Sequence, residues 1–119
     1  MPDVSTHLQQ ATHNEAFFSG INLDVYGDWA VTVLFYTALH YIDAYLATVG
    51  QLDPGSHDVR DSLIGRYAPT RQVWREYRRL KSFSRSARYY GSRFSPGDVR
   101  GLHLTALTAI KTRMLPLLR

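Results

Sequence analysis

Tyr36, His40 and Asp43 are polar side chains at helical spacing inside the most apolar stretch of the chain, residues 28–50. Positions i, i+4 and i+7 of a helix share one stripe. Histidine exchanges protons near neutral pH and a carboxylate can orient it, so this stripe has the residue types of an acid–base site. A second interpretation is a polar pair, His40 with Asp43, that is satisfied between packed helices, and a third is plain exposure on the surface. Asp43 can also pair with an arginine, the candidates being Arg60, Arg85 and Arg88.

Ser56, His57 and Arg60 form a second group, at the start of a predicted short helix. Ser56 is a suitable N-cap, and the first turn after a cap leaves backbone N–H groups free for an anion. His57 and Arg60 are three residues apart, so they can point the same way. The pattern indicates either a phosphate site or, for His57, an ordinary exposed residue at a helix start. His103 is interpreted as a structural residue at the edge of the core.

The third group is a row of arginines with aromatic residues between them. The arginines at helical spacing are Arg71, Arg75, Arg78 and Arg85, and the aromatic residues are Trp74, Tyr77, Tyr89 and Tyr90. Guanidinium groups bind phosphate and aromatic rings stack on bases, so this composition is typical of RNA or nucleotide binding. It is equally typical of a solvated face that pairs with acidic residues, of self-association, or of docking to another protein.

The net charge of +4 conceals a strong asymmetry along the chain. Residues 1–65 carry eight acidic residues and one basic residue, a net charge of −7. Residues 66–93 carry nine basic residues and one acidic residue, a net charge of +8. Residues 94–119 add four basic residues and one acidic residue, a net charge of +3. The basic block therefore faces nucleic acid, the acidic half of its own chain, or a partner.

Length and composition place the chain among ordinary globular proteins. Its 119 residues fit one domain, residues 1–119, with 45% hydrophobic and 20% charged residues. The absence of cysteine excludes disulfides and thiolate metal sites. No segment has the pattern of a signal peptide, and the central apolar stretch carries His40 and Asp43, so neither export nor a membrane span is expected. We predict a cytoplasmic protein.

No motif declares a cofactor or a metal. GxGxxG, P-loop, HExxH and GxSxG patterns are absent, and no cofactor is predicted. His13, His40 and His57 come from three predicted helices, and helical bundles can gather metal ligands in this way. Their spacing nevertheless has no local ligand signature, so no metal is predicted.

Capping signals and periodicity predict helices over residues 3–19 (starting at Asp3 or Ser5), 28–50, 57–66, 71–90 and 96–115. Their expected caps are Asp28 and Gly50 for the second helix, Ser56 for the third, Thr70 for the fourth and Ser95 for the last. The third helix is expected to pack through Val59 and Leu63. No stretch alternates with period two. We therefore predict an all-α, up-and-down bundle of four main helices and one short helix.

Three stretches together resemble the HEPN superfamily of small prokaryotic proteins, over roughly residues 5–115. They are FYTALHYIDAYLA on the central helix, SHDVRDSLI on the short helix and YRRLKSFSRSARYYG on the fourth helix. The resemblance implies a four- or five-helix bundle, often dimeric, that cleaves RNA, acts as a toxin, or binds nucleotides beside a nucleotidyltransferase. The residues that match this branch are Phe35, Tyr36, His40, Ser56, His57, Arg60, Ser84, Ala87, Arg88 and Tyr89.

One departure from that family bears on catalysis. Its metal-independent ribonucleases carry an arginine and a histidine with four to six residues between them at the start of the last helix. Here Arg100 and His103 have two residues between them, and Arg93 and His103 have nine. Whether the chain is an enzyme therefore stays open at this point.

The sequence leaves two hypotheses of different classes. The first is a HEPN-like protein that binds RNA or a nucleotide, either as a ribonuclease or as a toxin-type or defence accessory. As a ribonuclease it would use His40 and His57 as acid and base, with Asp43 orienting His40. The phosphate or RNA contacts would come from Arg60, Arg88, Arg85, Arg71, Arg75, Arg78, Tyr36 and Tyr89. The second is a non-catalytic interaction module that forms a homodimer or docks an acidic antitoxin-like or nucleotidyltransferase-like protein.

Overall fold

The computed structural model describes residues 3–52 and 54–118, and every secondary-structure element in these ranges is helical. The elements are α1 (Val4–Ser19), α2 (Gly27–Thr48), α3 (His57–Arg66), α4 (Ala68–Arg71), α5 (Trp74–Tyr89), α6 (Pro96–Leu102), the π-helical η1 (His103–Leu107), α7 (Thr108–Met114) and the 3₁₀-helical η2 (Leu115–Leu117). The described residues contain no strand, which confirms the all-α prediction.

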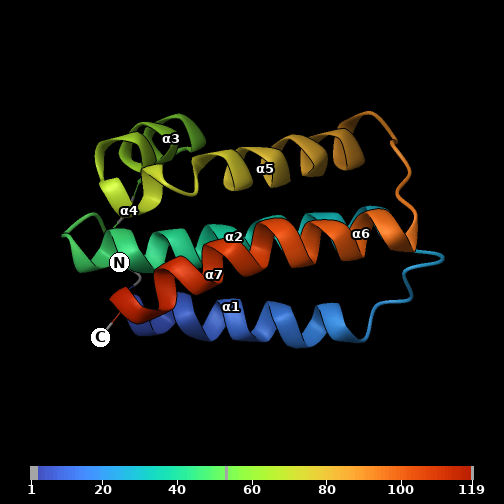
Figure 1. The fold of residues 1–119 in the computed structure, drawn as a ribbon, viewed down its shortest axis with the longest axis horizontal. Helices are drawn as coiled ribbons and strands as arrows, with labels where there is room; N and C mark the ends of the chain where they lie inside the picture. The colour runs from blue at the N-terminus through green and yellow to red at the C-terminus, as the bar shows by residue number, and fades with distance from the viewer. Residues whose placement is uncertain (1–2, 53, 119) are drawn as a thin grey trace.

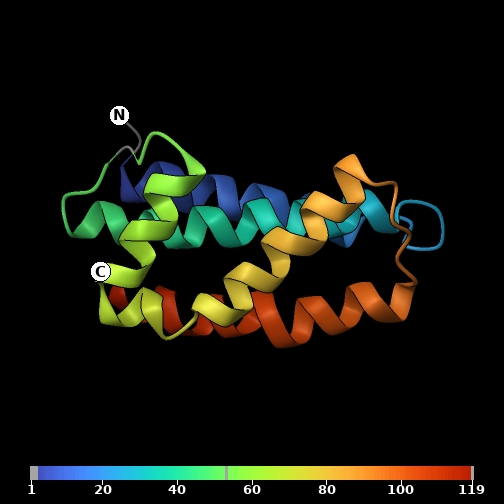
Figure 2. The same cartoon turned by 90° about the horizontal axis from the view of Figure 1, so that it is seen from above.

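The helices are arranged around α2, which lies in the middle of the bundle (Figures 1 and 2). Helix α1 packs along one side of it and α5 packs against another. Helices α6 and α7 run one after the other along the remaining side. Figure 2 shows that α3 lies over one end of α2, while α5 crosses obliquely and reaches α2 at the other end. Helices α1, α3 and α5 therefore all lie next to α2, the helix that carries the polar stripe.

Helix α2 forms the core because it is apolar on most of its surface. Its side chains from Ala30 to Leu46 are mostly buried, and Leu34, Phe35 and Ile42 are fully so. Its length and hydropathy would also allow it to cross a membrane, but 72% of its most apolar window is buried inside the bundle. This is the environment of a core helix in a helical bundle.

Helix ends follow the capping signals in most places. Asp3 accepts a hydrogen bond from the backbone N–H of Thr6, and Ser56 accepts one from that of Val59. Ser95 and Asp98 form a reciprocal capping box at the start of α6. Helix α2 differs from the prediction, because it begins at Gly27, one residue before Asp28, and its end is capped by Val49. Gly50 follows with a φ of +87°, a conformation that suits glycine.

The predicted fourth helix is wrong at its start. The helix predicted over residues 71–90 begins only at Trp74, and Arg71 is instead the last residue of the separate helix α4. Pro69 lies in the first turn of α4, a position that proline favours. Thr70 does not cap α5: its buried hydroxyl donates hydrogen bonds to the backbone carbonyls of Ile64 and Tyr67. Arg71 consequently lies on α4, whereas Arg75 and Arg78 lie on α5.

The last helix contains a π-helical segment that the sequence pattern does not predict. Element η1 carries one wide turn, in which the Thr108 hydroxyl donates to the carbonyl of His103. The core-facing residues of the last helix stay buried before, within and after this segment: Val99, Leu102, Ala106, Ile110 and Met114. On α3 the packing residues are Leu63 and Ile64, and the expected Val59 is 48% exposed. Val59 therefore lies on the outer side of α3, and the prediction that it packs against the core is wrong.

Two further features connect the helices at positions away from the α2 stripe: a hydrogen-bond network at Glu15 and a close backbone approach at Gly27. The Tyr41 hydroxyl donates a hydrogen bond to Glu15, which also accepts one from Lys111 at 3.0 Å, joining α1, α2 and α7. Burial raises the pKa of the Tyr41 phenol, so it remains a donor. Gly27 is buried, and a Cβ there would lie 2.3 Å from the carbonyl oxygen of Phe94. Only glycine allows the start of α2 to approach the segment before α6 so closely.

Candidate phosphate-binding cleft

Each residue of the α2 stripe contacts a different neighbouring helix. The Tyr36 hydroxyl accepts a hydrogen bond of 2.9 Å from Nη1 of Arg88 on α5. His40 Nδ1 lies 3.0 Å from Nδ1 of His7 on α1. Asp43 accepts two hydrogen bonds from Arg60 on α3, from Nε at 2.8 Å and from Nη2 at 3.0 Å. The stripe is therefore the line along which α1, α3 and α5 are fixed to the central helix.

The His7–His40 pair places two imidazoles between α1 and α2. One ring must donate and the other accept, so the pair shares one proton between its Nδ1 atoms. Burial lowers the pKa of both rings, and for His40 the charge of a protonated His7 acts in the same direction. Both histidines are consequently neutral near pH 7. This contact supports the structural interpretation of His40, with His7 rather than Asp43 as its partner.

Sequence reasoning missed His7. It lies four residues before Ala11, the only other fully or nearly fully buried residue of α1, so both belong to the inward face of that helix. A histidine on an inward face was the available signal. The sequence could not predict that His7 contacts His40, because this contact depends on how α1 is aligned along α2.

Asp43 and Arg60 form a bidentate ion pair in the interior. Their side chains are only 4% and 12% exposed, respectively. A planar guanidinium matches the two oxygens of a carboxylate, and this geometry offsets part of the cost of removing both charges from water. Arg60 is therefore already neutralised by Asp43, and the orientation of α3 on α2 depends on the pair.

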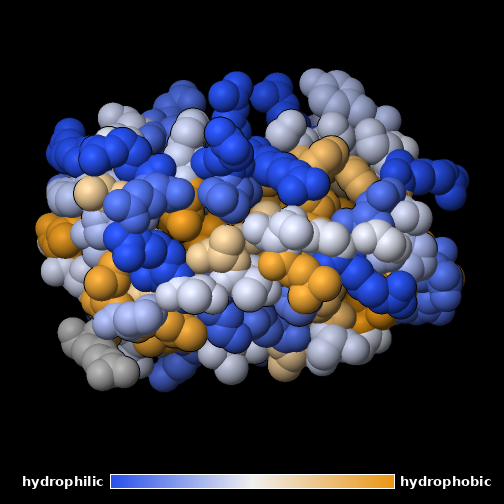
Figure 3. Space-filling view, in the orientation of Figure 1, coloured by the Kyte–Doolittle hydropathy of each residue, from blue (hydrophilic) through white to orange (hydrophobic). Residues whose placement is uncertain are grey.

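A cleft of about 460 Å³ lies beside this pair, between α3 and the second half of α5. We call it the α3–α5 cleft, and its lining residues are Phe35, His57, Asp58, Lys81, Arg85, Arg88, Tyr89 and Tyr90. In the space-filling view, hydrophilic side chains gather along the upper edge of the molecule, over α3 and α5 (Figure 3). The cleft is the place where cations from α5 and a histidine from α3 meet.

The cations of the cleft differ in how firmly they are held. Arg88 is held by the Tyr36 hydroxyl, and its guanidinium carbon lies 5.6 Å from the Tyr36 ring centre and 5.2 Å from that of Tyr89. Lys81 pairs with Asp61 at 2.6 Å. Arg85 is exposed and makes none of the ion pairs found among residues 3–52 and 54–118. One arginine is thus in a fixed position, and another is free to approach an incoming anion.

His57 contributes an N–H group to the cleft. Its Nδ1 lies 3.5 Å from Nη1 of Arg60, and a guanidinium only donates hydrogen bonds, so the lone pair belongs on Nδ1 and the proton on Nε2. Partial burial, then the positive charges of Arg60 and Lys81, lower the pKa of His57. A neutral imidazole that presents Nε2–H suits hydrogen bonding to a phosphate oxygen. Action as a general base at Nε2 would require the opposite tautomer.

The structure separates the predicted site residues into groups. His57, Arg85, Arg88 and Tyr89 line the α3–α5 cleft, and Tyr36 and Arg60 contact its lining residues. His40 and Asp43 do not line it, and the Asp43–Arg60 pair is what connects them to His57.

The remaining predicted residues lie elsewhere. Arg71 is exposed on α4 and donates to the Gly65 carbonyl, while Arg75 and Arg78 line a different depression. His13 is exposed on α1. Among the described residues, no three histidine, cysteine or acidic side chains are grouped so as to hold a metal ion.

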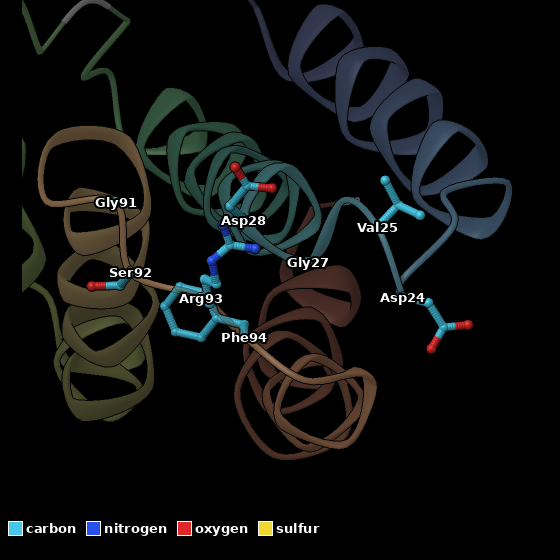
Figure 4. Close-up of a pocket in the computed structure, with 8 residues that line it drawn as sticks. All are labelled: Asp24, Val25, Gly27, Asp28, Gly91, Ser92, Arg93 and Phe94. Atoms are coloured by element: carbon cyan, nitrogen blue, oxygen red, sulfur yellow. The ribbon is translucent and has the colours of Figure 1, made fainter.

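A further hollow, of about 380 Å³, lies at the far end of the bundle where α2 begins. Figure 4 shows Asp28 and Arg93 on its inner side, and Asp24 on the opposite side, turned outward. Acidic and basic groups are mixed there and no histidine lines it, so its chemistry offers less to an anion than that of the α3–α5 cleft.

No protein-family model, curated protein or solved structure matches this chain. The functional argument therefore depends on the geometry of the site.

Proposed function

We propose that this chain is a HEPN-like protein that binds RNA or a nucleotide through the α3–α5 cleft. One observation carries the proposal: the cleft combines the cations Lys81, Arg85 and Arg88 with the N–H group of His57. Arginine and imidazole N–H groups match the oxygens of a phosphate. Among the described residues that line the cleft, Asp58 is the only acidic one.

Aromatic residues in the same cleft would receive the base. Tyr89 and Tyr90 are each 69% exposed at the end of α5, beside Arg88. Large exposed rings next to guanidinium groups favour stacking with nucleobases, which depends little on sequence. A phosphate held by Arg88 and His57 would leave its base near these rings.

The proposed activity is binding rather than cleavage. His40 faces His7 on the other side of the Asp43–Arg60 pair, so a concerted acid–base role of His40 and His57 has no common cavity to support it. Both rings have a lowered pKa, which leaves neither of them protonated near pH 7 as a general acid. The homodimer and the cytoplasmic location also remain predictions.

The binding of a mononucleotide tests the proposal directly. We expect the double variant Arg85→Ala, Arg88→Ala to bind AMP at least about tenfold more weakly than the unmodified chain, since it loses charge-assisted hydrogen bonds to phosphate. The matched control is Arg66→Ala, Arg113→Ala, which removes the same charge from exposed positions outside the cleft. Equal affinity of the two double variants, measured by calorimetry at low salt, would refute the proposal.

The same protein samples decide between binding and cleavage. Incubation with single-stranded RNA should leave the RNA intact, and a His57→Ala variant should lose affinity without any change in RNA length. Cleavage that disappears with His57→Ala would establish a ribonuclease instead. The alternative function, docking of an acidic protein, would show as a co-purifying acidic protein that remains after nuclease treatment.

A further inference from the structure

Helix α5 has two basic flanks, and the α3–α5 cleft uses only one of them. Its buried line is formed by Tyr77, Leu80 and Ser84. On one flank of this line, Lys81, Arg85 and Arg88 follow each other at i, i+4 and i+7 and face the cleft. The residues of the other flank are Arg75, Arg79 and Phe83, again at helical spacing.

The second flank borders two adjoining depressions. One part, of about 470 Å³, is lined by Trp74, Arg75, Arg78, Arg79, Ser82 and Phe83. A second part, of about 390 Å³, lies between α5 and α6 and shares Arg79 and Phe83 with the first. Together they form what we call the outer groove. The residues of the second part come from α5, from the segment before α6 and from α6 itself.

The charge of the outer groove is not balanced within the described part of the chain. Arg75, Arg78 and Arg79 are exposed, and the ion pairs found among those residues involve only Arg60, Lys81 and Lys111. Of the described residues that line the groove, one is acidic, Asp98. One oxygen of Asp98 already accepts the backbone N–H of Ser95 in the capping box. An acidic intramolecular partner, the simplest explanation for an arginine row, is therefore absent from this part of the chain.

Aromatic rings lie at both ends of this group of arginines. The Trp74 ring is stacked on that of Tyr77, with ring centres 6.1 Å apart and an angle of 28° between the planes. Phe83 packs edge-on against Phe94 at 5.7 Å, and the Arg79 guanidinium carbon lies 5.9 Å from the Phe83 ring centre. Fixed rings beside guanidinium groups offer surfaces for bases next to donors for phosphates.

We infer that the outer groove binds a single strand of RNA that also enters the α3–α5 cleft, so that one strand crosses α5. This inference rests on the proposed function of the cleft. A single strand presents bases and phosphates side by side, and along α5 the groove presents three arginines between two aromatic rings, those of Trp74 and Phe83. An acidic peptide would match the arginines but would leave Trp74 and Phe83 without a comparable partner.

Ligand length separates this inference from the function of the cleft. We expect the double variant Arg75→Ala, Arg78→Ala to bind AMP as the unmodified chain does and to bind a long single-stranded RNA about tenfold more weakly. The logarithmic salt dependence of RNA binding should decrease by about 1.4, since each lost phosphate contact in a single strand contributes about 0.7. Arg66→Ala, Arg113→Ala again supplies the charge-matched control.

A Trp74→Ala variant tests the stacking surface independently of charge. It should weaken binding of long RNA by about fivefold or more and leave the salt dependence and the AMP affinity unchanged. Its helix content, measured by circular dichroism, should match that of the unmodified chain. The two arginines contact no other side chain through a hydrogen bond or ion pair among the described residues, so their variant serves as the test if Trp74→Ala is misfolded.

The outcomes are distinct. If Arg75→Ala, Arg78→Ala keeps the affinity for long RNA while Arg85→Ala, Arg88→Ala loses that for AMP, the inference is overturned and the cleft stands. If AMP affinity survives the cleft variant, the proposed function fails instead. Polyglutamate that binds as tightly as RNA, with the same loss in the outer-groove variant, would identify an acidic protein as the occupant and would also overturn the inference.

Discussion

The polar stripe of α2 and the outer arginines of α5, Arg75 and Arg78, are both at helical spacing in the sequence and have opposite surroundings in the structure. On α2, Tyr36, His40 and Asp43 each contact a different helix, and Asp43 is only 3% exposed. On α5, Arg75 and Arg78 are exposed and have no acidic partner among the described residues. Helical spacing therefore brings side chains to one face, and the position of the helix in the bundle decides what that face does.

The physical basis of this contrast is the cost of removing charge from water. A charged group in the interior must be paired, and its partner is then fixed in position. An exposed arginine stays hydrated, costs the fold little, and keeps its hydrogen-bond donors for a ligand. The stripe of α2 therefore determines the structure of the site, and the arginines of α5 are available to bind.

Breaking the buried ion pair gives the largest expected effect. Arg60→Met leaves Asp43 as an unpaired charge in the interior, and the free energy of unfolding should decrease by about 3–5 kcal/mol. Urea denaturation measures it. The matched control is Lys81→Met, which breaks the Lys81–Asp61 pair, whose side chains are 27% and 26% exposed, and should cost below about 1 kcal/mol. Equal losses in the two variants would remove the contrast between interior and surface.

A second substitution sharpens the same test. Asp43→Leu combined with Arg60→Met removes both charges, and the double variant should recover much of the stability lost in Arg60→Met. No recovery would indicate that Arg60 stabilises α3 through contacts other than its pair with Asp43.

Acid should destabilise the protein through the His7–His40 pair, with a smaller effect than loss of the ion pair. Burial lowers the pKa of both rings in the folded state, whereas the unfolded chain takes up protons near its ordinary pKa of about 6.5. The unfolded state therefore binds more protons below that pH, and stability decreases as the pH falls from about 6.5 toward the lowered values. The urea midpoint at about pH 7.5 and about pH 5.5 measures this.

The double variant His7→Gln, His40→Gln isolates that contribution. Without the two titrating rings, the difference between the midpoints at the two pH values should become smaller. An unchanged difference would assign the acid sensitivity to other groups and would mean that the rings titrate normally.

The smallest effect on stability is expected on the outer side of α5. Arg75→Ala, Arg78→Ala removes exposed side chains, and the free energy of unfolding should change by no more than about 0.5 kcal/mol. The same denaturation experiment applies. A loss comparable to that in Arg60→Met would show that these arginines support the fold and would weaken the case that they are free for a ligand.

Local signals were sufficient for much of the fold. The predicted caps Ser56 and Ser95 start helices as expected, since a capping side chain bonds to backbone only three residues away. Asp3, one of the two predicted starts of the first helix, caps α1 in the same way. The break before α5 was missed, although Pro69 was the signal for it, because Thr70 also satisfied the pattern of a cap. The π-helical turn that begins at His103 has no signal in the periodicity of the apolar residues, which remain buried through it.

The sequence by itself determined which residues are polar at helical spacing, that the chain is all-helical, and that its positive charge is concentrated in the second half. Only the tertiary structure decided that His40 faces His7, that Asp43 binds Arg60, and that His57 enters a cleft with Arg88. Periodicity and capping depend on residues a few positions apart. Pairing between helices depends on how far each helix is shifted and rotated along its neighbour, and this follows from the packing of the whole core.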